Sequence, residues 1–151
     1  MRGQIPSQLV QLVGACRMIL NYLSFVVADM ARSLEFYRTL GLPVPAQAHL
    51  NAAGEPEDHV EVSVNGLRIA WETETLIAQV RAGWTAPTRE GRLSVAFDAG
   101  SPAGVDAACA RVRAEGFTVS ADPYDAFWGQ RYATLLDPDG NSVDVFAWLA
   151  K

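Results

Sequence analysis

Residues 130–148 read QRYATLLDPDGNSVDVFAW and contain the clearest structural signal in the chain. Apolar and polar residues alternate over 130–136 and again over 142–148, which is typical of half-buried β-strands. Between them, the DPDGN sequence at 137–141 combines the residues that favour tight turns. The segment therefore predicts two antiparallel strands that direct one face to a core.

The residues before this segment predict a strand and a helix. Leu93, Val95 and Phe97 alternate with other residues as in a strand, and residues 105–114 have the pattern of a helix that Gly116 ends. A loop with Asp122 and Pro123 is expected between this helix and the strand at 130–136.

The first part of the chain begins with the same plan. Residues 19–27 predict a strand, and the apolar stripe after it predicts a helix with Asp29 as its N-cap. Gly41 has the position of a left-handed C-cap, and Pro43 prevents the helix from continuing.

A hairpin follows this helix after a polar loop at 45–57. Residues 60–64 and 67–71 alternate as strands on either side of Asn65-Gly66, a pair that strongly favours a two-residue turn. Residues 73–82 then predict a short helix.

The two helix-ending glycines, Gly41 and Gly116, lie 75 residues apart, which indicates an internal duplication. We therefore predict an α+β fold made of two tandem βαβββ units at about 18–82 and 92–150. The units form one domain, 18–151, after an N-terminal tail at 1–17. A helix covers one face of each sheet, and the other face is open and forms a cleft.

Composition excludes several classes of function. The 151 residues suit one domain with its own core, and the net charge of −5 with scattered cations argues against nucleic-acid binding. No apolar run is long enough for a membrane span. Two cysteines far apart in sequence, Cys16 and Cys109, fit a reducing compartment, so we expect a cytoplasmic protein without a membrane or nucleic-acid partner.

The duplicated unit, together with FYRTLGL at 36–42 and DPDGN at 137–141, resembles the vicinal oxygen chelate superfamily. This superfamily holds glyoxalase I, extradiol dioxygenases, fosfomycin-resistance enzymes and bleomycin-binding proteins. Its shared fold, two paired sheets around a cleft, hosts several unrelated functions.

Several further segments resemble the mitomycin-binding and bleomycin-binding resistance proteins. They are, in order, residues 29–41, 69–73, 84–88 and 126–149. The resemblance implies a homodimer with clefts between its subunits. It also implies that the drug is sequestered without chemical turnover.

Metal-dependent members of the superfamily carry ligands at positions that correspond here to Tyr22, Ala70, Ser94 and Asp144. If the alignment with the superfamily is shifted by two residues in the third strand, Glu72 takes the ligand position in place of Ala70. Only one or two carboxylates remain, which is too few for a catalytic metal. We therefore expect no metal and no other cofactor.

The resemblance also implies which residues line the cleft. Trp84, Trp128, Tyr132 and Phe146 would stack on a flat ligand, while Leu23, Ile69, Val95 and Val145 would point away from it. The full set of predicted ligand-binding residues is Tyr22, Ser24, Arg68, Glu72, Trp84, Ser94, Trp128, Tyr132, Asp144 and Phe146.

The sequence thus predicts a metal-independent binding protein for a planar or aromatic small molecule, with antibiotic sequestration as its role. The alternative is a glyoxalase-like lyase or isomerase on the same fold, with Tyr22, Glu72 or Asp144 as acid or base. A regulatory or interaction module is a third possibility. His49 and His59, the only histidines, are expected to be exposed loop side chains.

Overall fold

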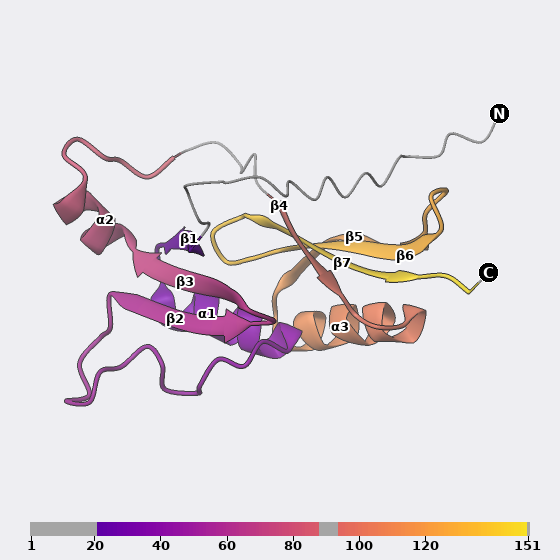
Figure 1. The fold of residues 1–151 in the computed structure, drawn as a ribbon, viewed down its shortest axis with the longest axis horizontal. Helices are drawn as coiled ribbons and strands as arrows, with labels where there is room; N and C mark the ends of the chain where they lie inside the picture. Colours follow the sequence, from indigo (N-terminus) through magenta and orange to yellow (C-terminus); the bar gives the residue numbers. More distant parts are fainter. Residues whose placement is uncertain (1–20, 88–93, 151) are drawn as a thin grey trace, which may run out of the picture.

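The computed structural model describes residues 21–87 and 94–150, so the predicted tail at 1–17 lies outside the described residues. Three helices and seven strands follow one another along this part of the chain (Figure 1). In order they are β1 (Tyr22–Val27), α1 (Met30–Leu40), β2 (His59–Val64), β3 (Leu67–Thr73), α2 (Glu74–Val80), β4 (Ser94–Asp98), α3 (Pro102–Ala114), β5 (Thr118–Asp125), β6 (Gln130–Leu136) and β7 (Ser142–Trp148).

The strands form two sheets with the same plan. The first has the order β1-β3-β2 and the second the order β4-β7-β6-β5. In both, the first strand is parallel to its neighbour, and the remaining pairs are antiparallel. The α+β prediction with two sheets is confirmed.

The first sheet has one strand fewer than the second. Where the second unit has β5, residues 45–57 form turns and a single bridge between Leu50 and Pro56. Pro45 and Pro56 cannot donate to a strand ladder, and Gly54 has a φ of 80°. The polar composition of this segment therefore leads to a loop in place of a strand.

The ends of α1 follow the sequence signals. The Asp29 side chain accepts from the backbone N–H of Arg32, and Gly41 has a left-handed φ of 114° that a residue with a side chain rarely adopts. The helix packs on the first sheet through Tyr37, whose ring centroid lies 5.2 Å from that of Phe25 and 5.1 Å from that of Trp71.

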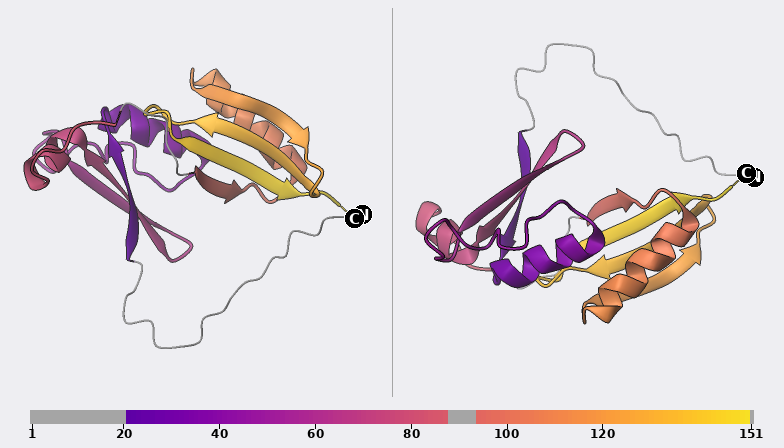
Figure 2. Two further views of the ribbon diagram at one scale, coloured as in Figure 1. Left: turned by 90° about the horizontal axis from the view of Figure 1, so that it is seen from above. Right: turned by 90° about the horizontal axis from the view of Figure 1, so that it is seen from below.

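The second sheet is covered by α3, which contacts β5, β6 and β7. In both views of Figure 2, α1 and α3 lie on one side of the molecule, where they contact each other. Phe117, after α3, packs edge-on against Phe36 at 5.2 Å and lies under the guanidinium of Arg32 at 3.9 Å. The helices and their flanking aromatic residues thus join the two units.

The turn between β6 and β7 also joins the units. Asp139 accepts hydrogen bonds from the backbone N–H of Ala28 at 2.9 Å and from the hydroxyl of Ser33 at 3.0 Å. Burial raises the pKa of Asp139, and these two donors oppose the increase.

The prediction of a loop around Asp122 and Pro123 is wrong, because both residues belong to β5. The strand has register shifts between Val119 and Ala121 and between Ala121 and Tyr124. It forms the edge of its sheet, where a proline and a bulge are tolerated because one side of the strand needs no partner.

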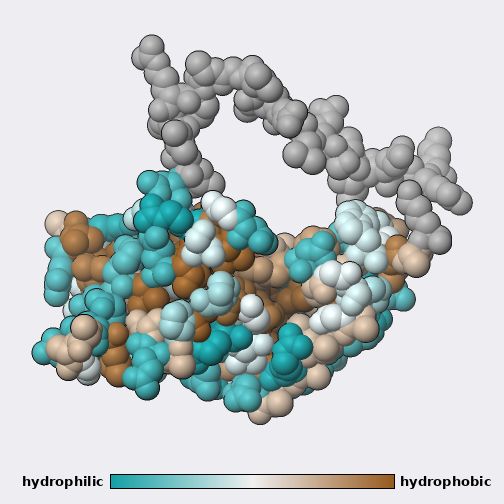
Figure 3. All heavy atoms as spheres, turned by 60° about the horizontal axis from the view of Figure 1, so that its bottom comes forward, coloured by the Kyte–Doolittle hydropathy of each residue, from teal (hydrophilic) through white to brown (hydrophobic). Residues whose placement is uncertain are grey.

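None of the helices in the described part of the chain is long and apolar enough to cross a membrane. Apolar surface gathers in the middle of the face drawn in Figure 3, between the two halves of the chain.

Candidate functional site

Within residues 21–87 and 94–150, each sheet has one face that neither α1 nor α3 covers, which we call its open face. Strand alternation and the register of β1 with β3 place Tyr22, Ser24, Arg68 and Glu72 on the open face of the first sheet. The opposite face holds residues such as Ile69, which is buried towards α1.

The open face of the second sheet follows from the same alternation. It holds Ser94, Tyr132, Asp144 and Phe146. Val95 pairs with Val143 on the helix-covered face, so the neighbouring Ser94 and Asp144 lie on the other face. Tyr132 pairs with Phe146 on the same side as Asp144. Leu23, Val95 and Val145 lie on the helix-covered faces with Ile69, as the sequence predicts.

Asp144 is the centre of a hydrogen-bonded group on this second open face. Its Oδ2 accepts from the hydroxyl of Ser94 at 2.6 Å, and its Oδ1 accepts from the hydroxyl of Thr134 at 2.8 Å. Burial, and then a hydrogen bond to Asp144, raise the pKa of Tyr132 to about 12. Tyr132 is therefore a neutral hydrogen-bond donor at physiological pH.

Aromatic rings adjoin this group. The ring of Trp128 lies 5.5 Å from Tyr132, 6.3 Å from Tyr124 and 4.9 Å from Phe127, in edge-on arrangements. Its Nε1 donates to the side-chain oxygen of Gln130 at 2.8 Å. We call Tyr124, Phe127, Trp128 and Tyr132 the aromatic cluster.

The aromatic cluster leaves much of its surface uncovered, since Phe127 is 90% exposed and Tyr124 is 43% exposed. Trp148, which lies on the same open face at the end of β7, is 64% exposed. Apolar rings of this size are normally buried, and here they gather with much of their surface uncovered at one end of a sheet.

The open face of the first sheet is mainly charged. Ser24 donates a hydrogen bond to Glu72, and the Nδ1 of His59 lies 3.4 Å from the other oxygen of Glu72. Arg68 donates from its Nε to Glu61 at 2.6 Å, and this bond lowers the pKa of Glu61. The charges of this face are thus largely paired with one another.

The expectation for the histidines needs correction. The strand β2 begins at His59, one residue before the predicted start at Val60. His59 pairs with Glu72, so its side chain lies beside Glu72 on the open face. His49 lies in the loop as expected, but it is half-buried and faces α1. Sequence reasoning also missed Thr134, and it expected Tyr124 near the cleft without including it among the ligand-binding residues.

Trp84 is separated from the other predicted ligand-binding residues. It is half-buried in the segment after α2, and that segment lies at the opposite end of the molecule from the turn between β5 and β6 (Figures 1 and 2). One chain therefore does not bring Trp84 and Trp128 together, because α2 leads the chain away from the second sheet.

The residues at the superfamily's metal positions do not fit a divalent metal. Ala70 offers no donor atom and is fully buried, and the Ser94 hydroxyl is used as a donor to Asp144. Tyr22 lies under the guanidinium of Arg68, 5.6 Å from its carbon, where a cation would be repelled. Within residues 21–87 and 94–150, no three His, Cys, Asp or Glu side chains are grouped so that they could hold a metal ion.

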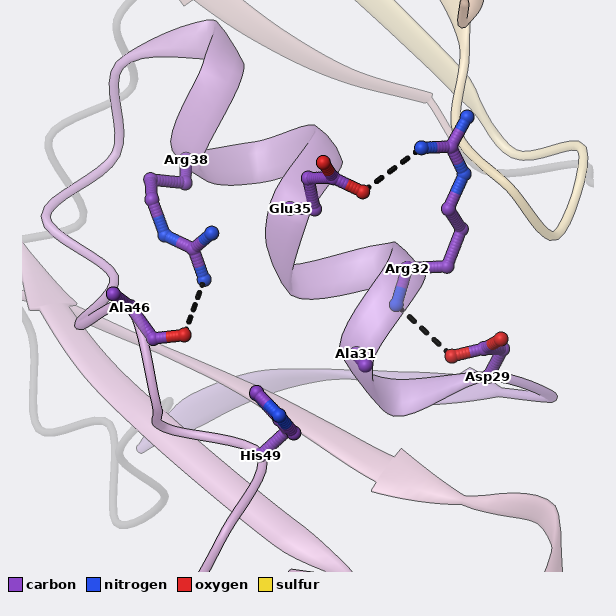
Figure 4. Close-up of a pocket in the computed structure, with 7 residues that line it drawn as sticks. All are labelled: Asp29, Ala31, Arg32, Glu35, Arg38, Ala46 and His49. Atoms are coloured by element: carbon purple, nitrogen blue, oxygen red, sulfur yellow. Dashed lines mark hydrogen bonds and ion pairs between the residues drawn. The ribbon is translucent and has the colours of Figure 1, made fainter. Parts of the chain in front are cut away.

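A cavity of about 350 Å³ lies away from the open faces, between α1 and the loop after it (Figure 4). The charged groups that line it have partners: Arg32 pairs with Glu35 at 2.8 Å, and Arg38 donates to the carbonyl of Ala46 at 3.3 Å. The first of these pairs lies within α1 and the second attaches the loop to the helix, so the cavity has a structural explanation.

Comparison with known proteins identifies the family. The model of the Glyoxalase/Bleomycin resistance protein/Dioxygenase superfamily matches residues 19–145. The chain belongs to this superfamily. No curated protein matches it.

Solved structures show the same fold. A glyoxalase/bleomycin resistance protein/dioxygenase from Nocardioides is 27% identical, with 91% of this chain and 87% of that chain covered and a TM-score of 0.64. A family enzyme from Burkholderia phytofirmans PsJN is 18% identical over 86% and 98% of the two chains, with a TM-score of 0.70. A lactoylglutathione lyase from Agrobacterium tumefaciens is 21% identical over 85% and 92%, with a TM-score of 0.60.

Proposed function

We propose that this protein binds a planar or aromatic small molecule without a metal, and that drug sequestration in the cytoplasm is its role. The observation that carries the proposal is the aromatic cluster beside Asp144 on the open face of the second sheet. Each well-placed aromatic contact with a ligand contributes about 0.5–1.5 kcal/mol beyond the burial of apolar area.

The hydrogen bonds of Asp144 support binding in preference to chemistry. Both of its oxygens already accept from hydroxyl groups, those of Ser94 and Thr134. A carboxylate that accepts from two protein hydroxyls holds those groups in place, and its remaining lone pairs can accept from a ligand. The group is better suited to fixing the rings and hydroxyls that surround a ligand.

We further propose a homodimer in which the first sheet of one copy faces the second sheet of the other. Among the described strands, β1 and β4 each form one edge of a sheet, and the exposed Phe127 and Trp148 supply apolar area for a contact with a second copy. In such a dimer, Trp84 of one copy lies near Trp128 of the other.

The test is a fluorescence titration of the purified protein with mitomycin C, bleomycin and related quinone or heteroaromatic compounds. A ligand that stacks on Trp128 quenches its emission saturably. Trp84→Phe and Trp128→Phe show which tryptophan reports the binding: quenching that persists in the first variant and is lost in the second comes from Trp128. Absence of saturable quenching and of calorimetric heat for every compound would contradict the proposal.

A lyase or isomerase is the second candidate, favoured by one observation. Glu72 lies between the hydroxyl of Ser24 and the ring of His59, which is an arrangement able to move a proton. One neighbour is named a lactoylglutathione lyase. If this chain shares that activity, it forms lactoylglutathione from methylglyoxal and glutathione, and Glu72→Gln abolishes the product while His49→Gln leaves it unchanged.

A further inference from the structure

Three aromatic side chains form a row across the open face of the second sheet. Phe146 on β7 pairs with Tyr132 on β6, and Tyr132 pairs with Tyr124 on β5, so the three rings share one side of the sheet. We call these three residues the aromatic row. On the next strand, β4, the row ends beside Asp98, which is the partner of Phe146. The four strands lie about 4.8 Å apart, so the distance from Asp98 to Tyr124 is roughly 14 Å, long enough for two or three fused rings.

Two carboxylates adjoin the aromatic row. Asp98 is exposed at its β4 end, and Asp144 lies on the same face of β7, one pleat away from the row. Asp98 accepts a hydrogen bond from the backbone N–H of Gly100 at 2.8 Å. Asp144 accepts from the hydroxyls of Ser94 and Thr134. All these donors are uncharged, so they hold the two carboxylates in place without neutralising their charge.

The arginines that the structure describes lie elsewhere. Arg131 belongs to β6 but pairs with Ala147 on the helix-covered face, where it donates to Asp106 of α3 at 2.8 Å. The others belong to α3 or to the first unit, as do both histidines. Within residues 21–87 and 94–150, the strands of the second open face therefore present Asp98 and Asp144 but no cationic side chain.

The aromatic rings and the carboxylates favour the same ligand charge. The face of an aromatic ring carries a negative potential, which attracts a cation within about 6 Å of the ring centroid. An uncharged flat ligand gains only the stacking on the aromatic row. An anion is repelled by Asp98 and Asp144, whereas a cation gains from the stacking, from the rings' potential and from both carboxylates.

We propose that the second open face selects organic cations, in the form of flat aromatic compounds that carry a positive charge. The ligand stacks on the aromatic row, and its charge lies beside Asp98 and Asp144. Asp98 thus joins the ligand-binding residues, although the sequence did not indicate it. This inference rests on the proposed function, because it names the charge class of the ligand that the same surface binds.

The experiment is isothermal titration calorimetry of the whole chain with three flat probes of similar size and different charge. They are 10-methylacridinium, a cation; acridine, which is uncharged in a slightly alkaline buffer; and 9-anthracenecarboxylate, an anion. We expect the cation to bind at least about tenfold more tightly than acridine, and the anion to bind most weakly. Added sodium chloride should reduce the preference for the cation, because salt screens exposed charges.

The outcomes separate this inference from the proposed function. If acridine binds as tightly as 10-methylacridinium, the inference is overturned, but the proposed binding of flat aromatic compounds stands. If none of the three probes binds saturably, both are overturned at this surface. A preference for the cation that salt leaves unchanged contradicts the role of the two carboxylates, and this measurement needs no variant.

Variants locate the charge selection. Asp98→Asn and Asp144→Asn are each expected to reduce the ratio of the cation's affinity to that of acridine by about threefold or more, and the double variant to remove the preference. Asparagine keeps an oxygen that can accept the local hydrogen bonds. Asp122→Asn is the matched control, because Asp122 belongs to the same sheet but pairs with Arg113 of α3.

Circular dichroism confirms that each variant is folded. An unchanged affinity ratio in the double variant overturns the assignment of Asp98 and Asp144. An equal fall of the ratio in Asp122→Asn also overturns it, because the effect would then reflect the net charge of the protein and not this face.

Discussion

The hydroxyl of Tyr37 on α1 donates a hydrogen bond to the carboxylate of Asp137, 2.9 Å away in the turn between β6 and β7. Both residues are buried, and Asn141 also donates to Asp137, at 2.9 Å. Burial, and then the charge of Asp137, raise the pKa of Tyr37 far above its usual range. The two sequence motifs that indicate the superfamily thus meet at the junction between the units, which this bond stabilises.

We expect Tyr37→Phe to lower the free energy of unfolding by about 1–3 kcal/mol, because Asp137 loses a buried donor. Chemical denaturation measures the change. Tyr22→Phe is the control, since Tyr22 is 40% exposed and its loss leaves no buried acceptor unpaired. A change of equal size in both variants would argue against the importance of this bond.

The raised pKa of Asp139 predicts a pH dependence of stability. A folded-state pKa above the unfolded value means that the folded protein holds this proton more tightly, so ionisation of Asp139 lowers stability. The cost is absent well below the ordinary pKa of 3.8 and grows as pH rises through the raised value. In urea denaturation at several pH values, Asp139→Asn should gain stability relative to the unchanged protein as pH increases. A constant difference would contradict the prediction.

The ionisation of Tyr132 can be followed directly. Its pKa of about 12 means that the folded protein loses stability as pH rises from 10.0 through about 12, where the unfolded residue is already ionised. Ultraviolet difference titration of Tyr132→Phe should lack one phenolate step near this upper value. Asp144→Asn should move the same step towards 10.0, because it removes a nearby negative charge.

The proposed homodimer predicts that light scattering at micromolar concentration gives twice the mass of one chain. Phe127→Ser and Trp148→Ser, introduced together, should shift the equilibrium towards the monomer because they remove exposed apolar area at the open face. Val80→Ser is the control: Val80 is 65% exposed on α2, outside the second sheet. A monomer mass for the unchanged protein at these concentrations would refute the dimer.

Local signals predicted much of the fold. The cap at Asp29, the left-handed Gly41 and the Asn65-Gly66 turn depend only on neighbouring residues, and all three lie where the sequence placed them. The open-face positions of Ser94 and Asp144 follow from strand alternation in the same way.

Contacts between distant strands could not be predicted in this way. Thr134 meets Asp144 only because β6 pairs with β7 in one register, and Tyr124 meets Tyr132 only after the register shifts of β5. The position of Trp84 depends on the direction in which α2 leads the chain, which no local pattern specifies.

Two tryptophans provide the sharpest test of the binding site. Trp71 is fully buried against α1, whereas Trp128 lies in the aromatic cluster on an open face. Trp71→Ala should cost about 3–5 kcal/mol of folding stability, because it leaves a cavity in the core. Trp128→Ala should change the midpoint of thermal unfolding much less, but should weaken ligand binding by about 1–3 kcal/mol, or roughly 5- to 150-fold in Kd.

Both quantities are measured on each variant, by calorimetric unfolding and by titration with the compound that quenches the unchanged protein. Because Trp128 donates to Gln130, Gln130→Ala is a further control: it removes this bond but keeps the ring. A large fall in the unfolding midpoint of Trp128→Ala with unchanged affinity would show that Trp128 supports the fold. In that case the aromatic cluster is not the ligand site, whichever compound is used.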